Sequence, residues 1–140
     1  MKEKTATILG STGLIGSKLL ELLLDDKNYK VIRVIVRRPV KFNNPSIQTE
    51  VIDFSDTESF KKAIAGSDAI FCAVGTTQKK VKGDRMAYYK VDYDIPVNAA
   101  RFCEETGCPV FSLVSSVGAD STSKNFYLKL KGEVEDKIRE

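Results

Sequence analysis

The stretch TATILGSTGLIG, residues 5–16, decides the fold of this chain. It opens with a short β-rich run, residues 5–9, and it ends where an apolar helical pattern begins. Gly10, Gly13 and Gly16 lie between the two with the spacing G-x-x-G-x-x-G. In a strand–turn–helix unit, the first glycine allows the tight turn, the second lets backbone approach a pyrophosphate, and the third lets the helix pack closely on the strand. The stretch therefore predicts a phosphate-binding turn between a strand and a helix.

The rest of the turn supports the same prediction. Ser11 and Thr12 can add hydroxyl donors, and Leu14 and Ile15 open the helix. The helix N-terminus offers free N–H groups and the positive end of its dipole to an anion. A glycine-rich turn without a ligand is the alternative, and the order of strand, turn and helix argues against it.

The 140 residues fit one domain, and 42% hydrophobic residues can form its core. The net charge is only +3, and basic residues are scattered among acidic ones, so the charge pattern does not indicate nucleic-acid binding.

The residue types present also exclude some kinds of site. The absence of histidine excludes a His-based triad and a His metal site, and no other cluster has metal-ligand spacing, so no metal is expected. No run approaches the roughly 20 apolar residues that span a bilayer, so no membrane segment is expected. Three cysteines without a C-x-x-C pair favour a reduced, cytoplasmic compartment.

Apolar runs alternate with helical patterns along the whole chain, which predicts βαβ units and a parallel sheet. The first helix is predicted to bury Ile15, Leu19, Leu22 and Leu23. Ser55 or Asp56 is predicted to cap the next helix. The expected fold is α/β, a doubly wound parallel sheet of about five strands with helices on both faces. The expected strands cover residues 5–9, 31–36, 51–52, 69–73 and 110–114. The expected helices cover residues 14–24, 55–65 and 125–140. Residues 86–106 are expected to be mostly helical, with the helix proper starting near Pro96, which would lie in its first turn.

The second strand ends in Arg37 and Arg38, where NAD-binding domains usually carry an acidic residue for the ribose hydroxyls. Two guanidinium groups suit a 2′-phosphate, so the sequence predicts NADP(H) in preference to NAD(H). The alternative is a solvated strand end. Asp53 and Phe54 are placed to reach the adenine, although Asp53 can equally belong to the start of the next helix.

Small residues follow the fourth strand. Val74 and Gly75 would let the pyrophosphate and the nicotinamide ribose lie against backbone.

A second set of residues points to proton transfer. Tyr127 and Lys131 are four residues apart and share a helix face. A nearby ammonium favours phenolate, and a phenol or phenolate can exchange a proton with a carbonyl or alcohol while a nicotinamide exchanges hydride. Ser115 and Ser116, after the fifth strand, can hydrogen-bond the reacting oxygen. Alone, the Tyr/Lys pair would be read as a solvated helix face.

These motifs together resemble the atypical short-chain dehydrogenase/reductases of the Rossmann superfamily, and most of all the Tat-interacting-protein-like oxidoreductases, which bind NADPH. The resemblance spans essentially the whole chain and is most specific over residues 115–135. It implies that residues 12–15, Arg37, Arg38, Val74 and Gly75 line the cofactor. It also implies that Tyr127 is the proton donor or acceptor and that Lys131 contacts the nicotinamide ribose.

Two departures from the family are visible. Extended members such as sugar-nucleotide epimerases usually carry Val-Asn where this chain has Val91-Asp92. Members also continue beyond the Tyr/Lys helix into a substrate lobe. Residues 1–140 are therefore expected to be one NAD(P)-binding Rossmann domain that is a fragment, a truncated product or a minimal nucleotide-binding half.

The expected function is that of an NADP(H)-dependent oxidoreductase acting on an unknown small carbonyl or alcohol. A non-enzymatic NADPH-binding module that regulates a protein partner is the alternative. A sugar-nucleotide epimerase or dehydratase is a further one, which Arg37 and Arg38 disfavour. The substrate and the oligomeric state stay open at this level.

Overall fold

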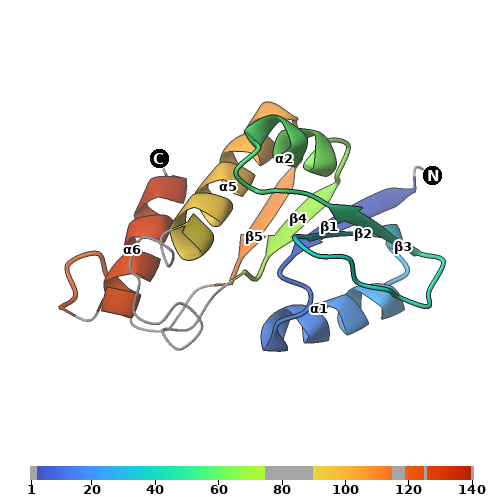
Figure 1. Cartoon of the computed structure of the whole chain (residues 1–140), viewed down its shortest axis with the longest axis horizontal. Coiled ribbons are helices and arrows are strands. Elements are labelled where there is room, and N and C mark those ends of the chain that lie inside the picture. Colours follow the sequence, from blue (N-terminus) through green and yellow to red (C-terminus); the bar gives the residue numbers. More distant parts are fainter. Residues whose placement is uncertain (1–2, 75–89, 115–118, 125, 140) are drawn as a thin grey trace.

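The computed structural model describes residues 3–74, 90–114, 119–124 and 126–139. Across those ranges, five strands form one sheet in the order β3-β2-β1-β4-β5, and every neighbouring pair is parallel (Figure 1). The strands are β1 (Lys4–Leu9), β2 (Tyr29–Val36), β3 (Ile47–Val51), β4 (Ala69–Cys72) and β5 (Val110–Leu113).

Helices cover both faces of this sheet. The described helices are α1 (Leu14–Asp25), α2 (Thr57–Ile64), a π-helical turn η1 (Lys90–Asp94), α5 (Ile95–Glu105) and α6 (Phe126–Arg139). In Figure 1, α1 lies on one face and α2 and α5 lie on the other. One core cluster joins Leu20 and Leu23 of α1 to Ile8 and Val34, and the other joins Phe60 of α2 to the opposite face. The doubly wound α/β fold is therefore confirmed.

The helix boundaries follow the local signals. Of the two candidate caps of α2, the structure selects Asp56, whose carboxylate accepts a hydrogen bond from the Ser59 backbone N–H at 3.2 Å. Pro96 lies in the first turn of α5, where its missing N–H leaves no hydrogen bond unmade. The predicted start of this helix near Pro96 is confirmed.

The predicted position of the third strand was only partly right, because Val51 is its last residue and Ile52 follows it. Residues 51–52 were expected from their apolar character, but β3 spans Ile47–Val51, and four of its five residues are exposed. It lies at the edge of the sheet, so it needs no continuous apolar sequence, and polar edge residues discourage pairing with other chains. The apolar pattern therefore found only the last residue of this strand.

The predicted buried stripe of α1 was also partly wrong. Ile15 and Leu22 are exposed by 53% and 69%, whereas Leu20 and Leu23 are buried against β1 and β2. The spacing of apolar residues fits more than one helix face because α1 is rich in leucine. The close approach of Gly16 to the turn fixes which face meets the sheet.

The strand ends define one edge of the sheet. Leu9 of β1 pairs with Ile35 of β2 on one side and with Cys72 of β4 on the other, so these three strands end at the same level. The chain winds outward to β2 and β3 and then crosses to β4 and β5. At such a reversal the connections diverge and leave a crevice outside the carboxyl ends, where ligands bind in open α/β sheets.

Candidate nucleotide-binding site

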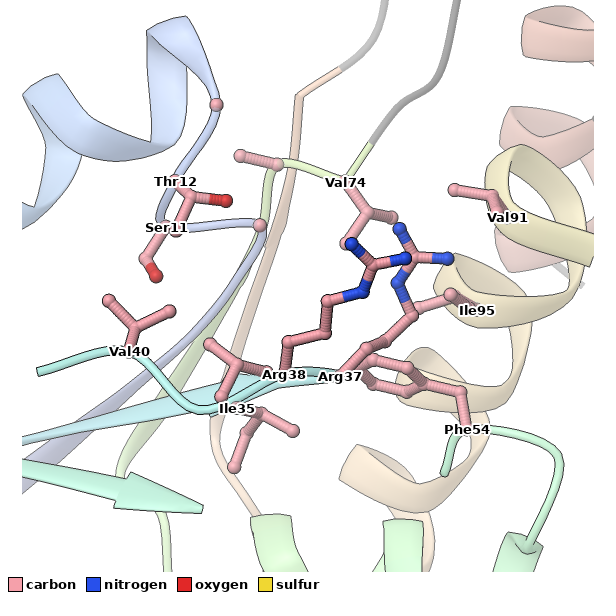
Figure 2. Close-up of a pocket in the computed structure, with 14 residues that line it drawn as sticks. Ser11, Thr12, Ile35, Arg37, Arg38, Val40, Phe54, Val74, Val91 and Ile95 are labelled. Atoms are coloured by element: carbon pink, nitrogen blue, oxygen red, sulfur yellow. The ribbon is translucent and has the colours of Figure 1, made fainter. Parts of the chain in front are cut away.

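A pocket of about 570 Å³ occupies this crevice, a volume within the roughly 300–1,000 Å³ usual for small-molecule sites. It lies against the carboxyl ends of β1, β2 and β4 and against the start of α5 (Figure 2). Its lining within the described part of the chain is Gly10, Ser11, Thr12, Gly13, Ile35, Val36, Arg37, Arg38, Val40, Phe54, Ala73, Val74, Val91 and Ile95.

The turn between β1 and α1 has the geometry that the glycine spacing predicts. Gly10 has φ +86°, and a Cβ there would lie 2.6 Å from the carbonyl carbon of Ala73. A Cβ on Gly16 would collide with the carbonyl oxygen of Gly10. The Gly13 N–H donates to that same carbonyl at 3.2 Å. Gly10 and Gly16 are therefore required for the close packing of turn, helix and neighbouring strand.

Gly13 is different, because the described protein atoms leave room for a side chain. It caps α1 with φ −75° and ψ 173°, a conformation open to any residue. A Cβ there would meet only the Gly10 carbonyl oxygen, at 3.6 Å, which is an ordinary contact. Since the fold does not require a glycine here, the position fits a backbone that a ligand approaches closely.

Ser11 and Thr12 bring two hydroxyl groups to the pocket wall, and the Thr12 hydroxyl points into the pocket (Figure 2). Ser11 is 3% exposed, and within the described residues its Oγ has no hydrogen-bond partner. Buried hydroxyls are nearly always satisfied, since an unmade hydrogen bond costs about 1–3 kcal/mol. This hydroxyl beside the N-terminus of α1 fits an anionic group such as a pyrophosphate.

Arg37 and Arg38 follow directly after β2 and extend their guanidinium groups toward Val74 (Figure 2). Both side chains are exposed, and no carboxylate of the described residues pairs with them. Two uncompensated guanidinium groups at the mouth of the pocket make this end of it positive and suited to a phosphate.

Phe54 lines the pocket between α2 and the arginines, whereas Asp53 does not line it. The Phe54 ring meets the buried ring of Phe60 edge-on at 5.0 Å, which fixes its position. The Asp53 carboxylate accepts hydrogen bonds from the backbone N–H and hydroxyl of Ser55, at 2.9 and 2.7 Å, and these bonds lower its pKa. Of the two roles considered for Asp53, the local turn before α2 is the one observed.

The predicted cofactor residues are thus largely brought together. Ile15 is exposed on α1, and neither it nor Gly16 belongs to the pocket lining. The side chain of Leu14, together with Gly75, Ser115 and Ser116, lies outside the described residues. Val40, Val91 and Ile95 also line the pocket, and none of them was predicted as a site residue because they are ordinary apolar residues.

Helix α6 carries both Tyr127 and Lys131, as predicted. The side chain of Tyr127 lies outside the described residues. Lys131 is not on a solvated face: its side chain is 8% exposed, and its Nζ lies 3.2 Å from an Asp92 carboxylate oxygen. The Asp92 side chain is fully buried. Asp92 was not predicted as a site residue, although its departure from the Val-Asn pattern had marked the position.

Comparison with known proteins gives a consistent result. A family model described as NAD(P)H-binding matches residues 10–140. Protein HTATIP2 of Rattus norvegicus is 36% identical over the whole chain, which covers 58% of that protein. Protein FMP52 of Candida albicans, named as mitochondrial, is 37% identical over 94% of the chain, which again covers 58% of the relative. The chain therefore spans less than two thirds of the length of these relatives.

Among solved structures, L-threonine dehydrogenase from Clostridium difficile superposes with a TM-score of 0.75 over 98% of this chain and 48% of its own, at 21% identity. At that identity the likeness shows the fold alone, which is a Rossmann fold. Separately, no helix in the described ranges is long and apolar enough to cross a membrane.

Proposed function

The chain belongs to the NAD(P)H-binding family, as its resemblance to the atypical short-chain dehydrogenase/reductases predicted, and from that premise we propose that it is the NADP(H)-binding domain of an oxidoreductase. The observation that carries the proposal is the pocket at the carboxyl edge. One of its walls carries the buried Ser11 hydroxyl and another carries the Arg37 and Arg38 guanidinium groups, and within the described residues the structure shows no partner for any of these groups. Both features suit a dinucleotide with an additional phosphate.

Each part of the pocket has a role in this proposal. The N-terminus of α1, with Gly13 and Ser11, holds the pyrophosphate through backbone N–H and hydroxyl donors. Arg37 and Arg38 hold the 2′-phosphate, since guanidinium groups bind phosphate bidentately. Phe54 packs on the adenine, because its ring is held at the pocket wall by Phe60.

The chemical roles are proposed from the family resemblance. When bound, NADPH would supply a hydride to the carbonyl carbon of a substrate, and Tyr127 would donate the proton to its oxygen, which together would give an alcohol. Ser115 or Ser116 holds the reacting oxygen by a hydrogen bond, and Lys131 holds the nicotinamide ribose. These roles come from the family resemblance and are proposed for this chain, as are a small carbonyl substrate and a cytoplasmic location. The fungal relative is named as mitochondrial, so the location of this protein has to be tested by a separate localisation experiment.

Differential stabilisation tests the cofactor assignment most directly. A ligand that binds only the native state raises the free energy of unfolding by RT ln(1 + [L]/Kd). We expect NADPH at a fixed concentration to raise the thermal midpoint substantially more than NADH at the same concentration. Adenosine 5′-monophosphate, which lacks both the pyrophosphate and the 2′-phosphate, is the control and should have little effect.

Equal stabilisation by NADH and NADPH would refute the NADP(H) preference, and no stabilisation by either would refute the site. Turnover is tested separately by NADPH oxidation with a panel of aldehydes and ketones. Wild-type turnover that the Tyr127→Phe variant loses, with NADPH affinity kept within a few-fold, supports the oxidoreductase. NADPH binding without turnover on any carbonyl would favour the regulatory module instead.

A further inference from the structure

Two of the three cysteines lie together at the turn that follows α5. Cys103 is in the last turn of this helix, and Cys108 comes directly after Gly107. Gly107 has φ +77°, and it directs the chain back so that the Cys108 backbone N–H donates to the Cys103 carbonyl oxygen at 3.0 Å. The third cysteine, Cys72, is at the other end of this part of the sheet, because it pairs with the last residue of β5 whereas the turn precedes β5.

The two thiols converge on one backbone carbonyl at the start of β5. The Val110 carbonyl oxygen lies 3.8 Å from the Cys103 sulfur and 3.4 Å from the Cys108 sulfur. The Cys103 sulfur also lies 3.4 Å from the carbonyl oxygen of Cys108. A disulfide requires Cβ atoms about 3.5–4.5 Å apart and side chains that are directed toward each other. The shared acceptor and the backbone hydrogen bond bring the two side chains close to that arrangement.

The two thiols differ in their access to reagents. Cys108 is partly exposed, whereas Cys103 is only 4% exposed. Burial, and then the neighbouring Cys108 thiol, raise the pKa of Cys103 to about 12, so its reactive thiolate is scarce at neutral pH. A reagent in solution should therefore meet Cys108 first, and Cys103 is placed to react second, within the same turn.

This pair of thiols lies away from the nucleotide pocket. The turn precedes β5 and so lies at the amino end of that strand, whereas the pocket lies outside the carboxyl ends of β1, β2 and β4. Ile95 at the start of α5 lines the pocket, and Cys103 is about 12 Å further along the helix axis. The reactivity of these thiols is therefore a property separate from the proposed cofactor binding.

We propose that Cys103 and Cys108 are a modification site: a low-molecular-weight disulfide such as oxidised glutathione converts them reversibly into an intrachain disulfide. The Cys108 thiolate attacks one sulfur of the small disulfide, forms a mixed disulfide and releases the first small thiol. Cys103 then gives up its proton and attacks the Cys108 sulfur, and the second small thiol leaves. In total, two protein thiols are oxidised to one disulfide, and the small disulfide is reduced to two thiols that carry the two protons.

The modification is reversible by the same chemistry. A small thiolate attacks the partly exposed Cys108 sulfur, and the steps then run in the opposite order. Exposed disulfides are the ones that small thiols reduce most readily, so an excess of reduced glutathione should restore both protein thiols.

The sequence allows the site to be followed by mass spectrometry. Arg101 and Lys124 bound a tryptic peptide, residues 102–124, that carries both cysteines of the turn and lacks Cys72. The reduced full chain is incubated with oxidised glutathione under native conditions, and free thiols are then blocked with N-ethylmaleimide in denaturant before digestion. We expect this peptide to carry no maleimide and to be lighter than its reduced form by two hydrogen atoms, while Cys72 is blocked. Reduced glutathione added before the block should restore both thiols.

Single variants separate the two steps. Cys103→Ala should stop the reaction at the mixed disulfide, with glutathione retained on Cys108. Cys108→Ala should react at least about tenfold more slowly than wild type, because the thiol left in the turn is buried and has a raised pKa. Cys72→Ala is the matched control: it removes a buried thiol outside the turn and should form the disulfide at the wild-type rate. The measurement on the wild type decides the question if a turn variant fails to fold.

A wild-type protein that retains glutathione on Cys108 without forming the intrachain disulfide would overturn the inference, and so would one that keeps both thiols reduced. A disulfide that involves Cys72 or joins two chains would also overturn it. Stabilisation of the reduced protein by NADPH tests the proposed function separately, so either proposal can fail without the other.

Discussion

Replacing Gly13 by alanine separates what the fold requires from what the ligand requires. The structure predicts almost no effect on the unliganded protein: the backbone at Gly13 has φ −75°, and the new Cβ would meet its nearest atom at 3.6 Å. Alanine is a poorer N-cap than glycine, by about 1 kcal/mol, but it lowers the entropy of the unfolded chain by a similar amount of free energy, and these two effects oppose each other. We expect a change in unfolding free energy within about 1 kcal/mol, or about 4 °C in the thermal midpoint.

Alanine substitutions at two other glycines provide a comparison for the expected change in unfolding free energy. Gly10 and Gly66 have φ of +86° and +81°, where an alanine costs about 1–2 kcal/mol. At Gly66 nothing lies within 4 Å of the added Cβ, whereas at Gly10 it would lie 2.6 Å from the backbone of Ala73. Gly10→Ala should therefore be more destabilising than Gly66→Ala by about 1–3 kcal/mol, the usual cost of overpacking.

In the presence of NADPH, Gly13→Ala should lose more stabilisation by the ligand than Gly66→Ala, although it is the milder change in the unliganded protein. NADPH at 100 times its Kd stabilises the wild type by about 2.7 kcal/mol. A methyl group on Gly13 would block the close approach of the pyrophosphate, and a tenfold loss of affinity would remove about 1.4 kcal/mol of that stabilisation. Gly66→Ala should keep the full stabilisation by NADPH.

Thermal unfolding of the three variants, with and without NADPH, measures both quantities. If NADPH stabilised Gly13→Ala as much as the wild type, then no ligand backbone contact at this position would be needed, and the assignment of the turn as a pyrophosphate site would be wrong. A loss of several kcal/mol in unliganded Gly13→Ala would contradict the geometric argument instead.

Three further predictions concern the pocket rim, the core and the cap of α2. Arg37→Ala and Arg38→Ala should each weaken NADPH binding by about tenfold or more and leave NADH binding within about twofold, as measured by fluorescence titration, because only NADPH carries the 2′-phosphate. Phe60→Ala should lower the unfolding free energy by about 3–5 kcal/mol in urea titrations, since this fully buried ring contacts the aromatic rings on either side of it; Phe60→Leu should cost less. The hydrogen bonds that the Asp56 carboxylate accepts from Ser59 lower its pKa below the ordinary value of 3.8. The contribution of Asp56 to stability is therefore present above that ordinary value and is lost as pH falls through the lower, folded-state pKa. Asp56→Ala should therefore be less stable than wild type at pH 6, and this difference should shrink when unfolding is measured in strongly acidic buffer.

Sequence patterns predicted a residue's role correctly where that role depends only on its neighbours in the chain. The turn at Gly10, the cap at Asp56 and Pro96 in the first turn of α5 are decided within a few residues, and all three agree with prediction. The β3 strand is decided by its place at the sheet edge, and its sequence IQTEV has three polar residues in the middle, so the apolar signal reached only Val51. Asp53 illustrates the same limit: its type and spacing fitted two roles, and only the fold showed its carboxylate turned to Ser55.

Local sequence patterns were enough to predict the order of strands and helices, the glycine turn and the two arginines at the end of β2, because hydrophobic periodicity and backbone sterics act over short distances. Which of these residues meet depends on the packing of distant elements, and the folded structure was needed to show it. It brought Phe54, Val74 and Val91 to the same pocket as the glycine turn, and it buried Lys131 against Asp92, 39 positions away in the chain. A pairing of that kind depends on how α6 packs against η1, and packing between distant elements leaves no periodic trace in a single sequence.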